Sequence, residues 1–71
     1  VMTNEECDIM LVVADSPGRR ILVSDLKKTR ADVRLLPSLI REKHLLYFEG
    51  GWVAMTDGGY DAMTRHCALN F

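Results

Sequence analysis

Residues 32–56 read DVRLLPSLIREKHLLYFEGGWVAMT, and this stretch decides the fold that the sequence predicts. Its first part divides into two faces when residues are placed about 100° apart, as on a helix. The leucines and Ile40 fall on one arc, whereas Arg34, Ser38 and Arg41 stand at i, i+4 and i+7 on the other. A helix buried along its leucine side would therefore present these three residues, the predicted ridge, to solvent.

The start of this helix has two possible positions in the sequence. Asp32 can cap it, and Pro37 then lies just beyond the first turn, where it removes a backbone hydrogen bond or bends the helix. A later start near Arg34 would make Pro37 harmless. The sequence leaves both starts open.

A β-hairpin is predicted directly after this helix. Leu45–Glu49 and Trp52–Thr56 are rich in aromatic and apolar residues, and Gly50-Gly51 separates them as a two-residue connection. Such a connection needs positive φ, which glycine adopts without steric cost.

The residues before this stretch predict two further helices and a strand. Thr3 to Glu6 has the form of a capping box, so a first helix begins near Asn4 and ends at Ser16-Pro17-Gly18. Its apolar stripe consists of Cys7, Met10, Leu11, Val13 and Ala14. Arg19–Val23 predicts a short strand that could add to the hairpin as a third.

Ser24 predicts the N-cap of a second helix from Asp25 to about Arg30, with Leu26 directed inward. After the hairpin, Thr56 can cap a last helix from Asp57 to about Cys67. Gly58-Gly59 weakens the start of that helix but lets another backbone come close.

The size and composition are those of one small soluble domain covering residues 1–71. The chain is 48% hydrophobic and 27% charged, and it has no apolar run near the roughly 18 residues that span a bilayer. We expect no membrane association and a cytoplasmic location. Cys7 and Cys67 are expected to be reduced, half-buried side chains, with a disulfide between the two ends as the alternative.

The charges are segregated along the chain although the net charge is only −1. Residues 1–18 carry four acids and no base, whereas residues 19–43 carry eight of the nine Lys and Arg. Such segregation creates a local positive field that could meet a polyanion. A solvated helical face is the alternative interpretation of the same pattern.

The order helix, strand, helix, helix, hairpin, helix resembles the winged helix-turn-helix of MarR-type and PadR-type bacterial regulators, a mostly helical α+β fold with a two- or three-stranded wing. Ile40-Arg41-Glu42-Lys43-His44-Leu45-Leu46 is similar to the exit of the recognition helix in that family. Val53-Ala54-Met55-Thr56-Asp57-Gly58-Gly59 is similar to its step from the last strand into the next helix.

The resemblance covers about residues 20–63 and implies a DNA-binding transcriptional regulator. By position, it implies base or phosphate contacts from Arg34, Ser38 and Arg41, and DNA-backbone contacts from Ser24, Lys27 and Lys28. Exposed cations nearby complete the candidate set for double-stranded DNA: Arg19, Arg20 and Arg30. We also expect a homodimer through the first and last helices, whose apolar faces are otherwise poorly covered.

A protein-binding adaptor or inhibitor is the alternative function. It would use the acidic first helix, or Tyr47 and Trp52 of the hairpin, although Trp52 in so small a chain is more often part of the core. An enzyme is not expected, because His44 and His66 are the only histidines and lack convergent titratable partners. No metal or other cofactor is predicted.

Overall fold

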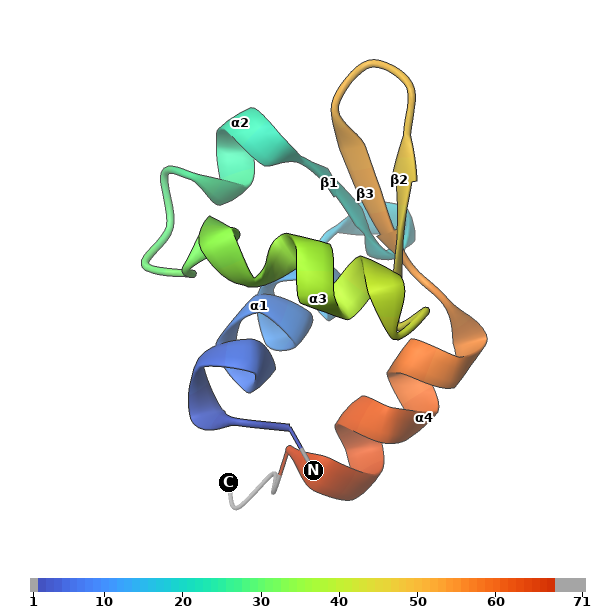
Figure 1. Cartoon of the computed structure of the whole chain (residues 1–71). Coiled ribbons are helices and arrows are strands. Elements are labelled where there is room, and N and C mark those ends of the chain that lie inside the picture. Colours follow the sequence, from blue (N-terminus) through green and yellow to red (C-terminus); the bar gives the residue numbers. More distant parts are fainter. Residues whose placement is uncertain (1, 68–71) are drawn as a thin grey trace.

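The first helix, α1 (Asn4–Ala14), begins at the predicted capping box (Figure 1). In the computed structural model, which describes residues 2–67, the Thr3 hydroxyl accepts a hydrogen bond from the Glu6 amide at 3.1 Å. The Thr3 amide donates in return to Glu6 Oε1 at 2.9 Å. The helix ends ahead of a 3₁₀ turn at Pro17–Arg19, so the predicted start and end of this helix are confirmed.

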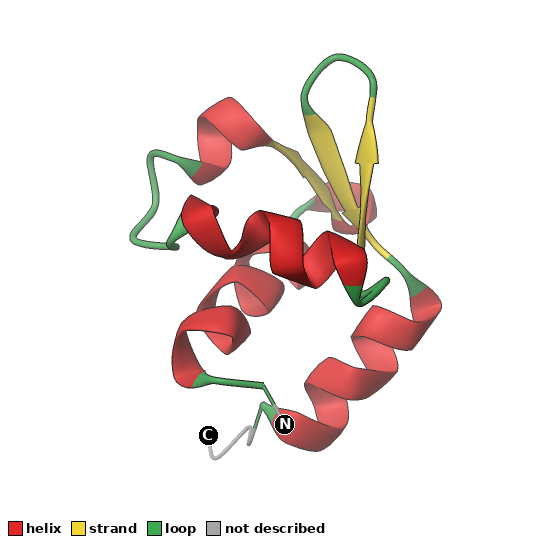
Figure 2. Ribbon diagram, viewed as in Figure 1, coloured by secondary structure: helices red, strands yellow, loops and turns green. Residues whose placement is uncertain are grey.

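Three short strands form an antiparallel sheet in the order β1-β3-β2 (Figure 2). They are β1 (Arg20–Leu22), β2 (Leu45–Phe48) and β3 (Trp52–Met55). Val53 lies at the centre of the sheet, opposite Ile21 on one side and Tyr47 on the other. The hairpin and its third strand are both confirmed.

The hairpin turn is one residue longer than predicted. Phe48 pairs with Trp52, so Glu49, Gly50 and Gly51 form the connection. The Gly51 amide donates to the Phe48 carbonyl at 3.2 Å, and the two glycines have φ of 93° and 85°. The prediction of positive φ is confirmed. The prediction of a two-residue connection is wrong, because strand pairing ends at Phe48 and Trp52 and leaves three residues between them.

The second helix, α2 (Val23–Leu26), is a single turn and is shorter than predicted. Its N-cap is Leu22, so the prediction of Ser24 as the N-cap is wrong. The cause is a long-range bond in which the Val23 amide donates to the Gly51 carbonyl at 2.7 Å, so that the helix follows β1 directly. Leu26 is fully buried, as predicted.

The third helix, α3 (Leu36–Arg41), follows a 3₁₀ turn at Val33–Leu35. Pro37 lies in the first turn of α3, where the missing amide leaves no hydrogen bond unmade. Asp32 caps the 3₁₀ turn, where its side chain accepts from the Arg34 amide, as the earlier start predicted. The α-helix itself begins at Leu36, so that Pro37 is harmless, as the later start predicted.

The last helix, α4 (Asp57–His66), is capped by Thr56 as predicted. The Thr56 hydroxyl accepts from the Gly59 amide at 2.8 Å and donates to the Lys43 carbonyl at 2.7 Å. The Thr56 amide donates to the His44 carbonyl at 3.1 Å, and the backbone of Gly59 lies directly against that same carbonyl. We call this group of Lys43, His44, Thr56 and Gly59 the Thr56 junction.

The core lies between the helices and the sheet, and every helix contributes to it. Ile9 is fully buried, although the sequence did not place it on the apolar stripe of the first helix, whereas Leu11 and Ala14 are only half-buried. The buried hydrophobic residues are Met2, Cys7, Ile9, Met10, Val13, Leu26, Ala31, Leu36, Leu39, Leu45, Val53, Met63 and Cys67.

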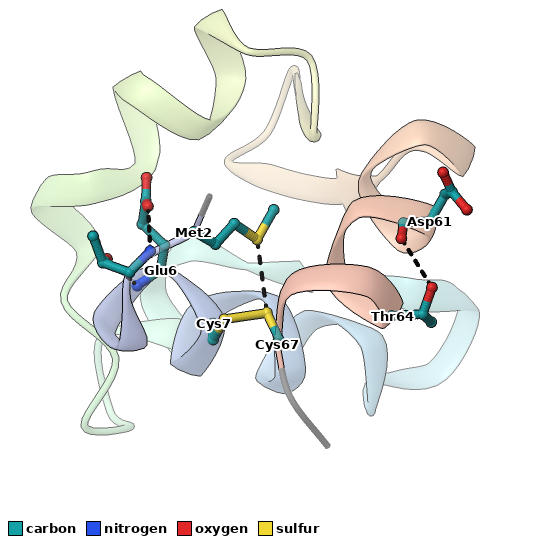
Figure 3. The surroundings of a disulfide bond; sticks show 7 residues. Met2, Glu6, Cys7, Asp61, Thr64 and Cys67 are labelled. Atoms are coloured by element: carbon teal, nitrogen blue, oxygen red, sulfur yellow. Dashed lines mark hydrogen bonds between the residues drawn. A yellow bond between two sulfur atoms is a disulfide. The ribbon is translucent and has the colours of Figure 1, made fainter. Parts of the chain in front are cut away.

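A disulfide joins Cys7 of α1 to Cys67, the residue that follows α4 (Figure 3). The expectation of two reduced thiols is therefore wrong, because packing of α1 on α4 brings the two Cα atoms within 5.5 Å. Met2 Sδ lies 3.7 Å from Cys67 Sγ. A disulfide sulfur carries no proton, so this is a packing contact between two sulfur atoms.

The chain thus has a small, mostly helical α+β fold with a three-stranded antiparallel sheet, as predicted at that level. Among residues 2–67, no helix combines the length and the apolar character that crossing a bilayer requires.

Two adjacent glycines provide a matched test of the Thr56 junction. Gly59→Ala should destabilise the fold by about 1–3 kcal/mol, because the new methyl group would overlap the His44 carbonyl. Gly58→Ala should instead stabilise α4 by about 0.5–1 kcal/mol, since its nearest neighbour is Thr56 Oγ1 at 3.9 Å. Urea unfolding measures the stability of both variants. Equal effects would contradict the close contact between the Gly59 backbone and the His44 carbonyl.

Reduction of the disulfide should lower the free energy of unfolding by roughly 4 kcal/mol, because the bond links residues separated by 60 positions. Denaturant unfolding with and without a thiol reductant measures the difference. The Cys7→Ala/Cys67→Ala variant is the control and should not respond to reductant. An unfolding midpoint that reduction leaves unchanged would show that the disulfide contributes nothing to stability.

Candidate nucleic-acid interface

Most of the predicted cations lie between the end of α2 and the start of β2. We call residues 27–43 the basic segment. It carries six Lys and Arg against Asp32 and Glu42, and all six cations are exposed. They are Lys27, Lys28, Arg30, Arg34, Arg41 and Lys43.

Arg34 is exposed but is held by a neighbouring carboxylate. Its Nε donates to Asp32 Oδ1 at 2.9 Å, and its second terminal nitrogen donates to Asp32 Oδ2 at 3.0 Å. Asp32 Oδ1 also accepts from the Arg34 amide at 3.1 Å. These hydrogen bonds hold the pKa of Asp32 below its ordinary value of 3.8 and raise that of Arg34. The Arg34 side chain is still 87% accessible to solvent, so its outer edge is free to meet a ligand.

Arg41 is the last residue of α3 and is exposed. Within residues 2–67 it takes part in no ion pair. A cation in the last turn also interacts favourably with the negative end of the helix dipole. Of the two predicted ridge arginines, Arg41 is therefore the one that is free of a carboxylate.

Ser38 does not stand on the exposed face that the sequence predicts. It is half-buried against α1, where its hydroxyl donates to Glu6 Oε2 at 3.4 Å. The prediction assumed one continuous α-helix, but the 3₁₀ turn before α3 advances about 120° per residue instead of about 100°. Ser38 is consequently rotated towards α1 relative to Arg34, and the predicted ridge is reduced to its two arginines.

The candidate DNA-binding residues around α2 are exposed, but Ser24 is not the N-cap that the sequence predicted. Ser24 lies inside α2 and makes no capping bond. Lys28 lies 3.6 Å from Asp25, with 79% of its side chain accessible. Lys27 and Arg30 are exposed and make no ion pair within the part of the chain that the structure describes.

Arg19 and Arg20 are committed to aromatic rings outside the basic segment. The Arg19 guanidinium lies 3.8 Å from the centroid of the Tyr60 ring on α4. That of Arg20 lies 5.1 Å from the centroid of the Trp52 ring on β3. Such contacts hold the two guanidinium groups over aromatic faces, an arrangement that the sequence did not predict.

The hairpin strand β2 is more exposed than sequence analysis expected: Tyr47 was proposed as a contact residue, but Leu46 and Phe48 were not. Leu46 and Phe48 are each 47% exposed and Tyr47 is 59% exposed, whereas Trp52 is half-buried. An unbroken apolar run such as Leu45–Phe48 is typical of a strand buried on both faces. This pattern gave no local signal that Leu46 and Phe48 would be exposed.

The histidines show no arrangement typical of catalysis. His44 is half-buried and lies 3.6 Å from Glu42, and His66 is exposed at the end of α4. Within residues 2–67, no three His, Cys, Asp or Glu side chains gather closely enough to hold a metal ion.

Comparison of the chain with models of protein families, with curated proteins and with solved structures finds no match. The resemblance to MarR-type and PadR-type regulators therefore rests on the motifs quoted above and on the order of the elements.

Titration of Asp32 tests the geometry of this site. Because hydrogen bonds from Arg34 favour the carboxylate, Asp32 should titrate below 3.8, and Arg34→Ala should return the pKa towards that value. The stabilisation from the pair is present above the unfolded pKa and is lost as the pH falls through the lowered folded pKa. Carboxyl NMR measures both titrations, and an Asp32 pKa that does not respond to Arg34→Ala would contradict the pairing.

Proposed function

We propose that the chain is a winged helix-turn-helix domain that binds double-stranded DNA through the basic segment. The observation that carries this proposal is the exposure of all six cations between Lys27 and Lys43 on a nearly neutral molecule. Charge gathered on one segment attracts a polyanion even where the net charge does not.

The architecture supports the winged-helix part of the proposal. One helix and a short strand precede two short helices, and a hairpin and a last helix follow them. The strand order β1-β3-β2 places the first strand beside the second strand of the hairpin. In a winged helix, α3 would be the helix that enters the major groove and the hairpin would be the wing.

The geometry of α3 favours phosphate contacts over reading of base edges. Ser38 turns towards α1, and the two arginines flank α3: Arg34 lies in the 3₁₀ turn before it and Arg41 is its last residue. Contacts to phosphates fix the position of a protein on DNA but carry no sequence information directly. We therefore propose binding with a steep dependence on salt and a weak dependence on sequence.

A single domain of this size offers few phosphate contacts, so we propose that the chain acts as a homodimer. The structure lends the expected interface on α1 and α4 less support than the sequence pattern did, because the apolar side chains of Ile9, Met10, Val13 and Met63 are buried within the chain. The surface of α1 and α4 that is left for a second copy is a shallow groove beside Tyr60.

A protein partner is the second candidate function, and the exposed side chains of β2 favour it. Large apolar side chains gathered on one surface mark sites of protein association. The acidic α1 is the other surface proposed for such a partner. Binding to random duplex DNA distinguishes these two functions.

The proposed cytoplasmic location has to accommodate the disulfide. Disulfides persist in oxidising compartments and are rare in the cytosol. In a reducing compartment the fold would have to be stable without the disulfide. The denaturant unfolding with a thiol reductant described above measures whether it is.

Removal of both ridge arginines tests the DNA-binding proposal. The chain should retard random duplex DNA at about 50 mM salt, and Arg34→Ala/Arg41→Ala should abolish the retardation without unfolding the domain. Arg65→Ala on α4 is the matched control and should bind like the parent chain, since Arg65 lies outside the basic segment and pairs with Asp61. Unaltered binding in the double variant would refute the proposed interface, and no binding by the parent chain would favour the protein partner.

Release of Arg34 from its carboxylate should strengthen binding. Asp32→Asn keeps an oxygen that can accept from the Arg34 amide but removes the charge that competes with phosphate, so affinity should rise several-fold. Asp61→Asn releases Arg65 on α4 in the same way and should have a smaller effect. Fluorescence anisotropy measures both, and equal effects would mean that Arg34 has no special place in the interface.

A further inference from the structure

The strand β2 is an edge of the sheet. It pairs with β3 on one side, and within residues 2–67 no strand pairs with its other side. Three of its four side chains are large, apolar and exposed: Leu46, Tyr47 and Phe48.

This edge strand is short, at four residues, which is itself protective, but it lacks the other features by which edge strands usually avoid association. Protected edges carry a charged residue, a proline or a bulge within the strand, or are covered by another element. Leu45–Phe48 contains no charge and no proline, and its register with Trp52–Met55 is continuous. The opposite edge strand, β1, differs in carrying the charged Arg20.

Within residues 2–67, the outward backbone groups of this edge have no hydrogen-bond partner, and the residues that carry them can be assigned. The Thr56 amide donates to the His44 carbonyl, so residues 44 and 56 form a hydrogen-bonded pair. Because such pairs alternate along an antiparallel ladder, Leu46 and Phe48 bond to β3, and Leu45 and Tyr47 direct their amides and carbonyls away from it. The hydrogen bond from the Val23 amide to the Gly51 carbonyl is consistent with this assignment. It implies that Gly51 and Val53 direct their backbone groups towards β1, which leaves Trp52 and Ala54 to bond with β2.

We propose that β2 pairs antiparallel with β2 of a second copy of this chain, with Leu46 opposite its own symmetry mate. In this register Leu45 of each copy lies opposite Tyr47 of the other, so the residues with free backbone groups meet in hydrogen-bonded pairs. The two sheets become one continuous six-stranded sheet with a two-fold axis at Leu46. The edge strand is then no longer exposed.

The charges that flank β2 indicate that its binding partner is a second copy of this chain. Lys43 lies three residues before Leu46 and Glu49 lies three residues after it, and both are exposed. The antiparallel register brings Lys43 of each copy towards Glu49 of the other. Neither residue has an ion-pair partner within residues 2–67. The two-fold axis thus supplies a partner to four charges with no requirement for another protein.

The exposed side chains fit the same arrangement. Leu46 projects from the same face of the sheet as Phe48 and Trp52, since cross-strand partners share a face. Pairing about Leu46 would bring its side chain against that of its symmetry mate. A dimer of this kind is independent of DNA and can be tested without it.

Sedimentation velocity over a range of concentrations tests the dimer, with the full chain expected to associate reversibly. Leu46→Lys places two like charges opposite each other at the axis and should weaken dimerisation by at least about tenfold. Tyr60→Glu places a charge at the groove between α1 and α4, with Arg19 as its partner, and should leave dimerisation unchanged. A parent chain that is monomeric at all concentrations, or a dimer that is lost only in Tyr60→Glu, would overturn the proposal.

Exchange of the end charges provides a second test that leaves the apolar strand intact. Lys43→Glu and Glu49→Lys should each weaken dimerisation by about tenfold, because each sets like charges opposite each other twice in the dimer. The double variant Lys43→Glu/Glu49→Lys should recover the parent affinity. Circular dichroism checks that each variant is folded. Failure of the double variant to recover would overturn the proposed register.

Discussion

The Thr56 junction is the constraint on which the rest of the fold depends. One carbonyl, that of His44, accepts from the Thr56 amide and also lies against the Gly59 backbone. The same threonine hydroxyl caps α4 and donates to the Lys43 carbonyl. The end of α3, both hairpin strands and the start of α4 are therefore fixed relative to one another. This arrangement also sets the direction in which the basic segment enters the sheet.

Local signals in the sequence predicted the parts of the fold that depend on neighbouring residues. The capping box of Thr3 and Glu6, the cap at Thr56 and the positive φ of Gly50 and Gly51 all act within a few positions, and all are present. The pair Gly58-Gly59 also suggested that another backbone comes close, although its partner, the His44 carbonyl, is distant in sequence and was not predicted. The α+β class and the third strand followed from the order of these elements.

The features that sequence analysis missed depend on distant residues or on a change of helical pitch. The start of α2 is set by the bond from Val23 to Gly51, and the disulfide by packing of α1 on α4. The orientation of Ser38 depends on the 3₁₀ turn before α3, which a helical wheel of constant pitch cannot represent. The seven candidate cations are all exposed, as expected, and their contacts with DNA stay a prediction. The contacts of Arg19 with Tyr60 and of Arg20 with Trp52 were not predicted, because they join residues distant in sequence.

Two surfaces of different chemistry meet where α3 runs into β2. The basic segment gathers charge suited to a phosphate backbone, and the adjoining edge strand offers apolar side chains and free backbone groups suited to a second copy. If both proposals hold, pairing through β2 would join two basic segments in one dimer, with Lys43 of each copy near Glu49 of the other and the other five cations of each segment available to phosphates. NMR mapping of the backbone amides during titration with duplex DNA tests the central proposal most directly. If the basic segment binds DNA, the largest shifts should fall in residues 27–43 and α4 should be little affected. Shifts concentrated in α1 or in α4, with residues 27–43 unchanged, would contradict this proposal.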